Sequence, residues 1–218
     1  MVRAFERPAT IALPAEAGGE GWVLEGLVVP VPDGSAGGAV IAPPHPLMGG
    51  SMESPVVTEI VHACGRAGLY SLRFNWRGVG ASAGAASGEP EVADVDYRAA
   101  LQFLCETVEP PYVACGYSFG SLAALRAIRH APVPSRLILV APVTTMLDAD
   151  LLLDFPGEIL LLAGQHDDWV DTGALSELAV QAKSARLEVI PRCDHFFMSG
   201  IAQLGQAITA WWDEIGSI

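Results

Sequence analysis

Three residues that lie far apart in the chain, Ser118, Asp167 and His195, have the types needed for nucleophilic chemistry. A serine hydroxyl is a weak nucleophile near neutral pH because it keeps its proton. A histidine within hydrogen-bond reach can take that proton, and a carboxylate can hold the imidazole in the required tautomer. Such a set can attack a carbonyl carbon, so the first question is whether the fold brings the three together.

The serine lies in Gly-Tyr-Ser-Phe-Gly, residues 116–120. The apolar residues before it are typical of a buried strand, and residues 122–128 are typical of a helix. A strand, a tight turn and a helix are the context in which a G-x-S-x-G pattern holds a nucleophile in a strained conformation. Gly116 and Gly120 would then let strand and helix approach closely. A plain strand-to-helix turn is the alternative, since the chain has 23 glycines.

In α/β proteins that present a serine in this way, the acid and then the base follow it along the chain. Each should come just after a strand, because the carboxyl ends of parallel strands meet at one edge of the sheet. Asp167 and Asp168 both follow the predicted strand 158–163, and we favour Asp167 because the residues after it can then return to the core. His195 follows the predicted strand 186–190 and precedes the last helix.

A tetrahedral intermediate carries negative charge on the former carbonyl oxygen, and two fixed N–H donors stabilise it. The backbone N–H of Phe119 is the first candidate because Phe119 follows the nucleophile. We expect the second donor in the loop 43–50, where three prolines have no N–H. Leu47 is the preferred donor and Met48 is next. The other interpretation of this loop is a rigid turn that crosses the sheet edge.

Side chains near these segments are candidates for a substrate pocket. They are His45, Met48, Arg77, Tyr117 and Leu151. Leu151 belongs to the segment 144–155, whose leucines can instead pack a short helix onto the core. This segment is too short for a cap domain, so we expect an open cleft.

The hydrophobic pattern and the turn residues predict the elements that position these side chains. Segments 10–13 and 22–31 are expected to form an antiparallel strand pair. Strands and helices then alternate, which is typical of a mostly parallel sheet with helices on both faces. The further predicted strands are 39–42, 69–75, 112–115, 136–141, 158–163 and 186–190, and the predicted helices are 54–67, 92–108, 122–130, 172–183 and 201–215. We expect a single domain over residues 1–218.

Composition limits the classes of partner. The chain of 218 residues has 12 Lys and Arg against 25 Asp and Glu, a formal net charge of −13. This balance repels a nucleic-acid backbone, so we expect a small-molecule substrate and no nucleic-acid partner. The sequence shows neither a membrane-spanning run nor the apolar core of a signal peptide, which favours a cytoplasmic location. It leaves the oligomeric state open.

No cofactor or metal is expected. Cys193, Asp194 and His195 are ligand types, but three consecutive residues in one loop without a second cluster are weak evidence for a metal site. The loop 78–80 lacks the glycine pattern of dinucleotide sites, and the chain has no phosphate-binding loop motif.

From about Ile11 onward, nearly the whole chain resembles the α/β-hydrolase superfamily. Within it, the chain is similar to a small bacterial group without a cap domain. Members of that group carry a His-Pro-His-Pro-x-x-Gly-Gly loop and a Leu-Arg-Phe-Asn-x-Arg-Gly-Val-Gly-x-Ser segment. The corresponding segments here are 43–50 and 72–82, and the segments 116–120, 164–168 and 194–197 agree as well.

The resemblance implies the α/β-hydrolase fold, a Ser118-Asp167-His195 triad and an esterase acting on a small to medium acyl ester or thioester. One position departs from the group, since Pro43 replaces the first His of the loop. If that His contacts substrate, a different leaving group or a slow reaction follows. A non-catalytic binding or assembly protein and an acyltransferase with the same triad are the alternatives.

Overall fold

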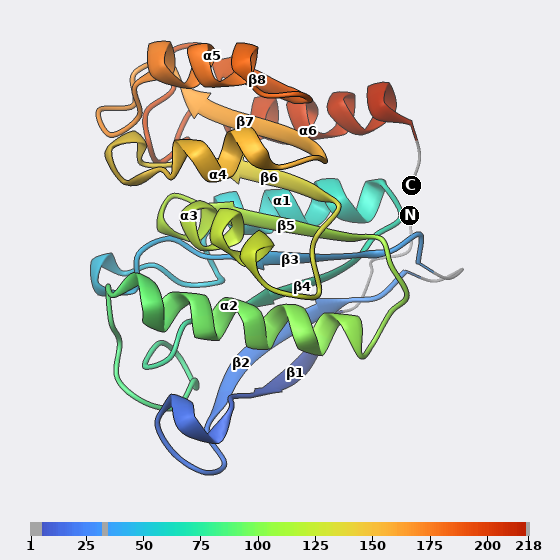
Figure 1. Ribbon diagram of the computed structural model, residues 1–218, viewed down its shortest axis with the longest axis vertical. Coiled ribbons are helices and arrows are strands. Elements are labelled where there is room, and N and C mark those ends of the chain that lie inside the picture. Colours follow the sequence, from blue (N-terminus) through green and yellow to red (C-terminus); the bar gives the residue numbers. More distant parts are fainter. Residues whose placement is uncertain (1–5, 32–34, 217–218) are drawn as a thin grey trace.

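The computed structural model describes residues 6–31 and 35–216. These residues form one eight-stranded sheet with helices packed around it (Figure 1). The strands are β1 (Arg7–Ala12), β2 (Val23–Val29), β3 (Gly38–Ala42), β4 (Tyr70–Phe74), β5 (Tyr112–Tyr117), β6 (Arg136–Val140), β7 (Glu158–Gly164) and β8 (Ala185–Ile190). Their spatial order is β1-β2-β4-β3-β5-β6-β7-β8. The first two strands pair antiparallel, β2 pairs antiparallel with β4, and every later pairing is parallel.

Six α-helices within the described ranges cover the sheet. They are α1 (Pro55–Arg66), α2 (Pro90–Cys105), α3 (Phe119–Arg126), α4 (Ala149–Asp154), α5 (Thr172–Gln181) and α6 (Ile201–Ile215). Helices α1 and α6 pack together behind the sheet in Figure 1, and α2 and α3 lie in front of it. None of the described helices is both long and apolar enough to cross a membrane.

The central strands are buried on both faces, which explains their unbroken apolar sequences. Every residue of β3 is buried, and only the first residue of β5, β6 and β7 is partly exposed. The sequence therefore predicts these strands to within about two residues. Between β6 and β7 the chain forms only a short turn, η4 (Thr144–Met146), and α4. The predicted absence of a large cap domain is confirmed for this connection.

The loop 43–50 is more regular than its proline and glycine content predicts. It contains a single 3₁₀ turn, η2 (Pro46–Met48), with His45 at its N-cap. Pro46 sets the first helical φ, and the His45 ring nitrogen Nδ1 accepts the Leu47 N–H at 3.2 Å. A side-chain cap and a proline at the first position together stabilise a turn that periodicity cannot reveal.

Glycine is required on both sides of Ser118. A Cβ on Gly120 would lie 2.5 Å from the carbonyl oxygens of Ala42 and Pro43, and a Cβ on Gly116 would overlap the Gly120 carbonyl group. These separations are far below van der Waals contact, and the obstructing atoms are backbone, which cannot move aside. The close approach of β3, β5 and α3 therefore depends on these two glycines.

We predict that Gly116→Ala lowers the free energy of unfolding by about 3 kcal/mol, because overpacking here displaces backbone. Urea denaturation monitored by tryptophan fluorescence measures the change. The matched control is Gly65→Ala in α1, where an added Cβ meets nothing within 4 Å. That control should raise stability by about 0.5–1 kcal/mol. Equal unfolding midpoints for Gly116→Ala and the wild type would contradict the packing argument.

Candidate functional site

Ser118 lies in the tight turn that joins β5 to α3. Its backbone has φ 55° and ψ −118°, a positive-φ conformation that is strained in a residue other than glycine. Three hydrogen bonds hold it there. The Ser118 N–H donates to the Val140 carbonyl at 2.8 Å, and the Ser118 carbonyl accepts the Ser121 hydroxyl at 2.5 Å and the Ser121 N–H at 3.0 Å. The surrounding structure therefore fixes the direction of the serine side chain.

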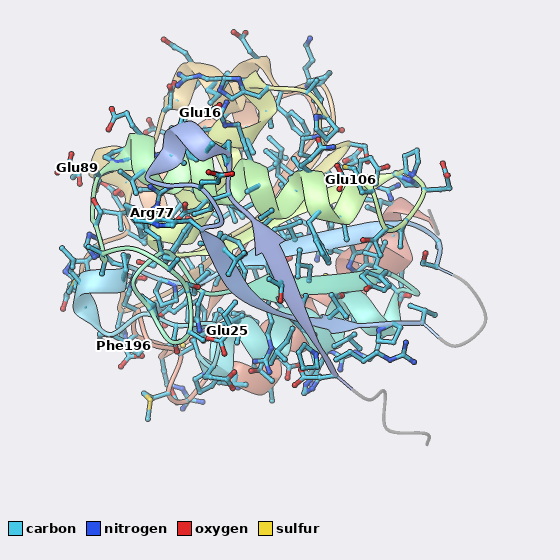
Figure 2. The ribbon with its side chains drawn as sticks, turned by 90° about the horizontal axis from the view of Figure 1, so that it is seen from below. Glu16, Glu25, Arg77, Glu89, Glu106 and Phe196 are labelled. Atoms are coloured by element: carbon cyan, nitrogen blue, oxygen red, sulfur yellow. The ribbon has the colours of Figure 1, made fainter. Side chains whose placement is uncertain are left out.

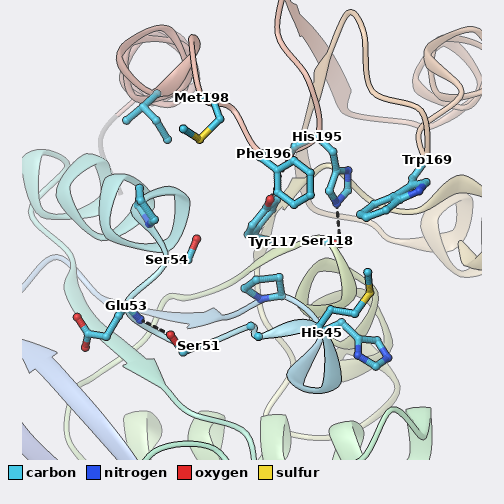
Figure 3. Close-up of a pocket in the computed structure, with 16 residues that line it drawn as sticks. His45, Ser51, Glu53, Ser54, Tyr117, Ser118, Trp169, His195, Phe196 and Met198 are labelled. Atoms are coloured by element: carbon cyan, nitrogen blue, oxygen red, sulfur yellow. Dashed lines mark hydrogen bonds between the residues drawn. The ribbon is translucent and has the colours of Figure 1, made fainter.

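The loops after β5, β7 and β8 bring Ser118, Asp167 and His195 together. The Ser118 Oγ lies 2.9 Å from His195 Nε2 (Figure 3). On the other side of the ring, His195 Nδ1 lies 2.7 Å from Asp167 Oδ2. Because a carboxylate only accepts hydrogen bonds, Nδ1 is the donor and Nε2 of the neutral ring accepts the serine proton. Ser118, Asp167 and His195 are only 6%, 9% and 5% exposed, so little water competes for these hydrogen bonds.

Asp167, and not Asp168, is the carboxylate next to the histidine. Its Oδ1 accepts the backbone N–H of Trp169 at 2.9 Å, which leaves Oδ2 directed at His195. Asp168 is exposed. Asp171 instead caps α5 through the Ala174 N–H at 3.0 Å.

Tyr117 connects the turn that holds the serine to the loop that holds the histidine. Its hydroxyl donates to the His195 carbonyl at 2.9 Å, and its ring centroid lies 5.7 Å from that of His195. Burial raises the pKa of Tyr117, and the nearby carboxylates of Asp167 and Asp194 raise it further. The hydroxyl therefore stays protonated and remains a donor around neutral pH.

The backbone N–H groups predicted to bind the oxyanion differ in whether they already have a hydrogen-bond partner. Phe119 is the first residue of α3, so its N–H has no carbonyl partner within the helix. The Leu47 N–H donates to His45 Nδ1 at 3.2 Å, and the Met48 N–H donates to the His45 carbonyl at 3.0 Å. Both loop donors are thus engaged inside their own turn, and only that of Leu47 is bound to a side chain.

A cavity of about 590 Å³ opens beside Ser118. Its lining includes three of the predicted pocket residues, His45, Met48 and Tyr117. Sequence reasoning missed other members of the lining: Pro44, Gly49, Gly50, Ser51, Glu53, Ser54, Pro55, Trp169, Phe196, Met198 and Ile201. Three of these are large apolar residues within three positions of the acid or the base. That proximity along the chain was the available signal.

Arg77 and Leu151 do not line the cavity, contrary to prediction. The Arg77 side chain is buried beside α2, where Nε donates to Asp96 Oδ1 at 2.8 Å and Nη1 donates to the Ala17 carbonyl at 2.7 Å (Figure 2). A buried guanidinium requires such a partner, and Asp96 supplies it from another element. Leu151 lies on α4 and packs against the hydrophobic core. This is the alternative given above for the leucines of the segment 144–155.

Pro43, the departure from the resembled loop, also lies outside the cavity lining. It is buried, and its carbonyl accepts the Trp76 indole N–H at 3.1 Å. Buried Pro43 is therefore tied to Trp76 through its backbone and belongs to the support beneath the loop. Across residues 6–31 and 35–216, no three or more His, Cys, Asp or Glu side chains come together as a metal site.

Comparisons with known proteins give a family match and a sequence relative. The model of a family described as serine aminopeptidase, S33, matches residues 47–154. An uncharacterized protein of Rickettsia prowazekii is 28% identical over 182 residues, which cover 78% of this chain and 76% of that protein.

Solved structures match almost the whole chain. An α/β serine hydrolase homologue from Coxiella burnetii is 25% identical with a TM-score of 0.82, covering 94% of this chain and 96% of its own. An α/β serine hydrolase from Xanthomonas campestris, described as lacking a lid, is 28% identical with a TM-score of 0.79. The match covers 94% of this chain and 92% of that protein. The protein thus has the α/β-hydrolase fold, and these matches support its place in the α/β-hydrolase superfamily.

Proposed function

We propose that this protein is a serine hydrolase that cleaves a carboxylic ester or thioester through an acyl-enzyme on Ser118. The observation that carries the proposal is the buried chain of hydrogen bonds from Ser118 through His195 to Asp167, with the serine held in a strained turn. A purely structural serine has no need of such a conformation at a cavity wall.

In the first half of the reaction, His195 Nε2 takes the Ser118 proton as Oγ forms a bond to the substrate carbonyl carbon. Asp167 stabilises the imidazolium and keeps Nδ1 protonated. When the carbonyl re-forms, the bond to the leaving alcohol or thiol breaks, and His195 returns the proton to that group. Water then attacks the acyl-enzyme by the same route, which releases the acid and restores the serine hydroxyl.

The negative charge of each tetrahedral intermediate needs two donors. The Phe119 N–H is the first, since it has no partner within α3. The Leu47 N–H is the second in our proposal, because its bond to His45 Nδ1 is to a side chain that can turn away. The Met48 N–H would have to leave a backbone carbonyl of its own turn.

Trapping the acyl-enzyme tests the proposal. The wild-type protein is mixed with p-nitrophenyl butyrate, quenched in acid within the first turnover and digested for mass spectrometry. We expect the peptide that contains Ser118 to gain the mass of one butyryl group, and the released product to be butyric acid. Turnover without any acylated Ser118 peptide would contradict the mechanism. Transfer of the butyryl group to an added alcohol in preference to water would indicate the acyltransferase instead.

The Tyr117 hydroxyl is expected to position the base. We predict that Tyr117→Phe lowers kcat/KM about fivefold, because one buried hydrogen bond to the His195 loop is lost. Tyr112 offers the matched control, since it lies on the same strand and its hydroxyl donates to the Val108 carbonyl at 3.1 Å. Tyr112→Phe should leave kcat/KM within about twofold. Equal effects of the two substitutions on kcat/KM would show that Tyr117 acts only on stability.

A further inference from the structure

Large apolar side chains are concentrated at the cavity. In the described part of the chain, the exposed large apolar residues are Leu47, Met48, Val133, Met146, Trp169, Val180, Val189, Phe196 and Met198. Four of them, Met48, Trp169, Phe196 and Met198, also line the cavity beside Ser118. Exposed apolar side chains that gather around a cavity mark a binding surface, whereas scattered ones need no explanation.

One part of the cavity lining comes from the start of α1 and from the residues before and at the start of α6, and we call this part of the cavity the arm. We define this arm by Ser54 and Pro55 at the start of α1 and by Phe196, Met198 and Ile201 before and at the start of α6. Figure 3 shows Met198 and Phe196 on one side and Ser54 on the other. Met198 is 82% exposed, so a ligand chain that covers it removes apolar surface from water.

The charges around the arm disfavour an anionic ligand. Within residues 6–31 and 35–216, no Lys or Arg lines the cavity, and Glu53 supplies its single carboxylate. Among the described residues, the cation paired with Glu53 is Arg73, whose Nη2 lies 3.8 Å from Glu53 Oε2 and 2.9 Å from Glu6 Oε2. Arg73 is buried, its Nη1 and Nη2 atoms already have protein partners, and it does not line the cavity, so it is not placed to bind a ligand carboxylate or phosphate there. The net charge of −13 acts in the same direction.

We propose that this arm binds an uncharged aliphatic chain of the substrate, with Met198 and Phe196 against the chain. The proposal rests on ester hydrolysis at Ser118 and adds the substrate class, a neutral ester with a medium-length alkyl portion. Cavities of this size enclose most of a drug-sized ligand, so an acetyl ester would leave the arm unfilled. An apolar chain gains binding free energy in proportion to the area it buries there.

The test measures kcat/KM for two series of neutral esters. One series varies the acyl chain from acetyl to octanoyl with p-nitrophenol as the alcohol, and the other varies the alkyl alcohol from methyl to octyl with an acetyl group. We expect a rise with chain length in one series, which also identifies the portion that occupies the arm. In that series, Met198→Ser should lower kcat/KM about fivefold for the longest substrate, the octanoyl or octyl ester. For the shortest substrate, the acetyl or methyl ester, the loss in kcat/KM should be less than twofold.

Met146→Ser is the matched control, since Met146 is also exposed but does not line the cavity. It should leave the chain-length dependence unchanged. A second experiment uses a charged substrate. The p-nitrophenyl monoester of octanedioic acid should react at least tenfold more slowly than p-nitrophenyl octanoate. Glu53→Gln should narrow that difference, because it removes the lining carboxylate.

The outcomes separate this inference from the proposed function. Ser118-dependent hydrolysis with no chain-length dependence, or with equal losses in Met198→Ser and Met146→Ser, would overturn the arm and leave the hydrolase intact. A preference for the anionic probe would also overturn it. No hydrolysis of any ester by the folded protein would remove the proposed function on which the inference rests.

Discussion

Replacing Ser118 with alanine should lower kcat for ester hydrolysis about 10⁶-fold, to the level of a contaminating background. The variant has no atom that can form the acyl-enzyme, so every later step is lost as well. His195→Ala should cause a loss of similar size, because the hydroxyl 2.9 Å from Nε2 then keeps its proton. The measurement is steady-state hydrolysis of a p-nitrophenyl ester, with both variants purified in parallel with the wild type.

The control and the double variant make this prediction specific. Ser135→Ala removes an exposed hydroxyl that contacts only the Tyr112 carbonyl, and should leave kcat within about twofold. Groups that act as a unit are strongly non-additive, so the Ser118→Ala/His195→Ala variant should lose no more than either single variant. Retention of more than about a tenth of kcat in Ser118→Ala would contradict the assignment of the nucleophile.

The second large effect is expected at the acid. Asp167→Asn should lower kcat about 10⁴-fold, because an amide at 2.7 Å from His195 Nδ1 donates a hydrogen bond where the carboxylate accepts one. The imidazole would then carry its proton on Nε2 and could not accept the Ser118 proton. Hydrolysis assayed between pH 6 and about pH 9 measures the loss.

Asp168 provides the comparison, since it is the neighbouring residue, identical in type and exposed. Asp168→Asn should leave kcat within about twofold at every pH. Both variants remove one negative charge, so a general electrostatic effect would be the same in the two. If Asp168→Asn were the more damaging substitution, the acid of the proposed mechanism would be wrong.

Sequence reasoning locates the strands and the chemistry-bearing residues because both obey local rules. Central strands such as β7 are unbroken apolar runs, and the G-x-S-x-G turn needs glycine where β5 meets α3. The residues that lie together at the sheet edge, Ser118, Asp167 and His195, each follow a parallel strand. Their proximity is a consequence of strand order, which the chain sequence indicates through its alternation of strands and helices.

Long-range pairing is what the sequence could not show. Arg77 follows β4 as a pocket residue would, yet Asp96 of α2 binds its guanidinium within the interior. The His45 side chain engages the Leu47 N–H only because the turn at Pro46–Met48 closes. The arm at Met198 exists because the N-termini of α1 and α6 lie side by side, and no local pattern encodes that contact.

Reaction of the folded protein with a fluorophosphonate probe, followed by peptide mass spectrometry, tests the central claim most directly. The proposed mechanism predicts one phosphonyl group per chain on the peptide that contains Ser118, no labelling of that peptide in Ser118→Ala, and labelling slowed by at least about 100-fold in His195→Ala. A folded wild-type protein that remains unlabelled, or that is labelled only at another residue, would contradict it.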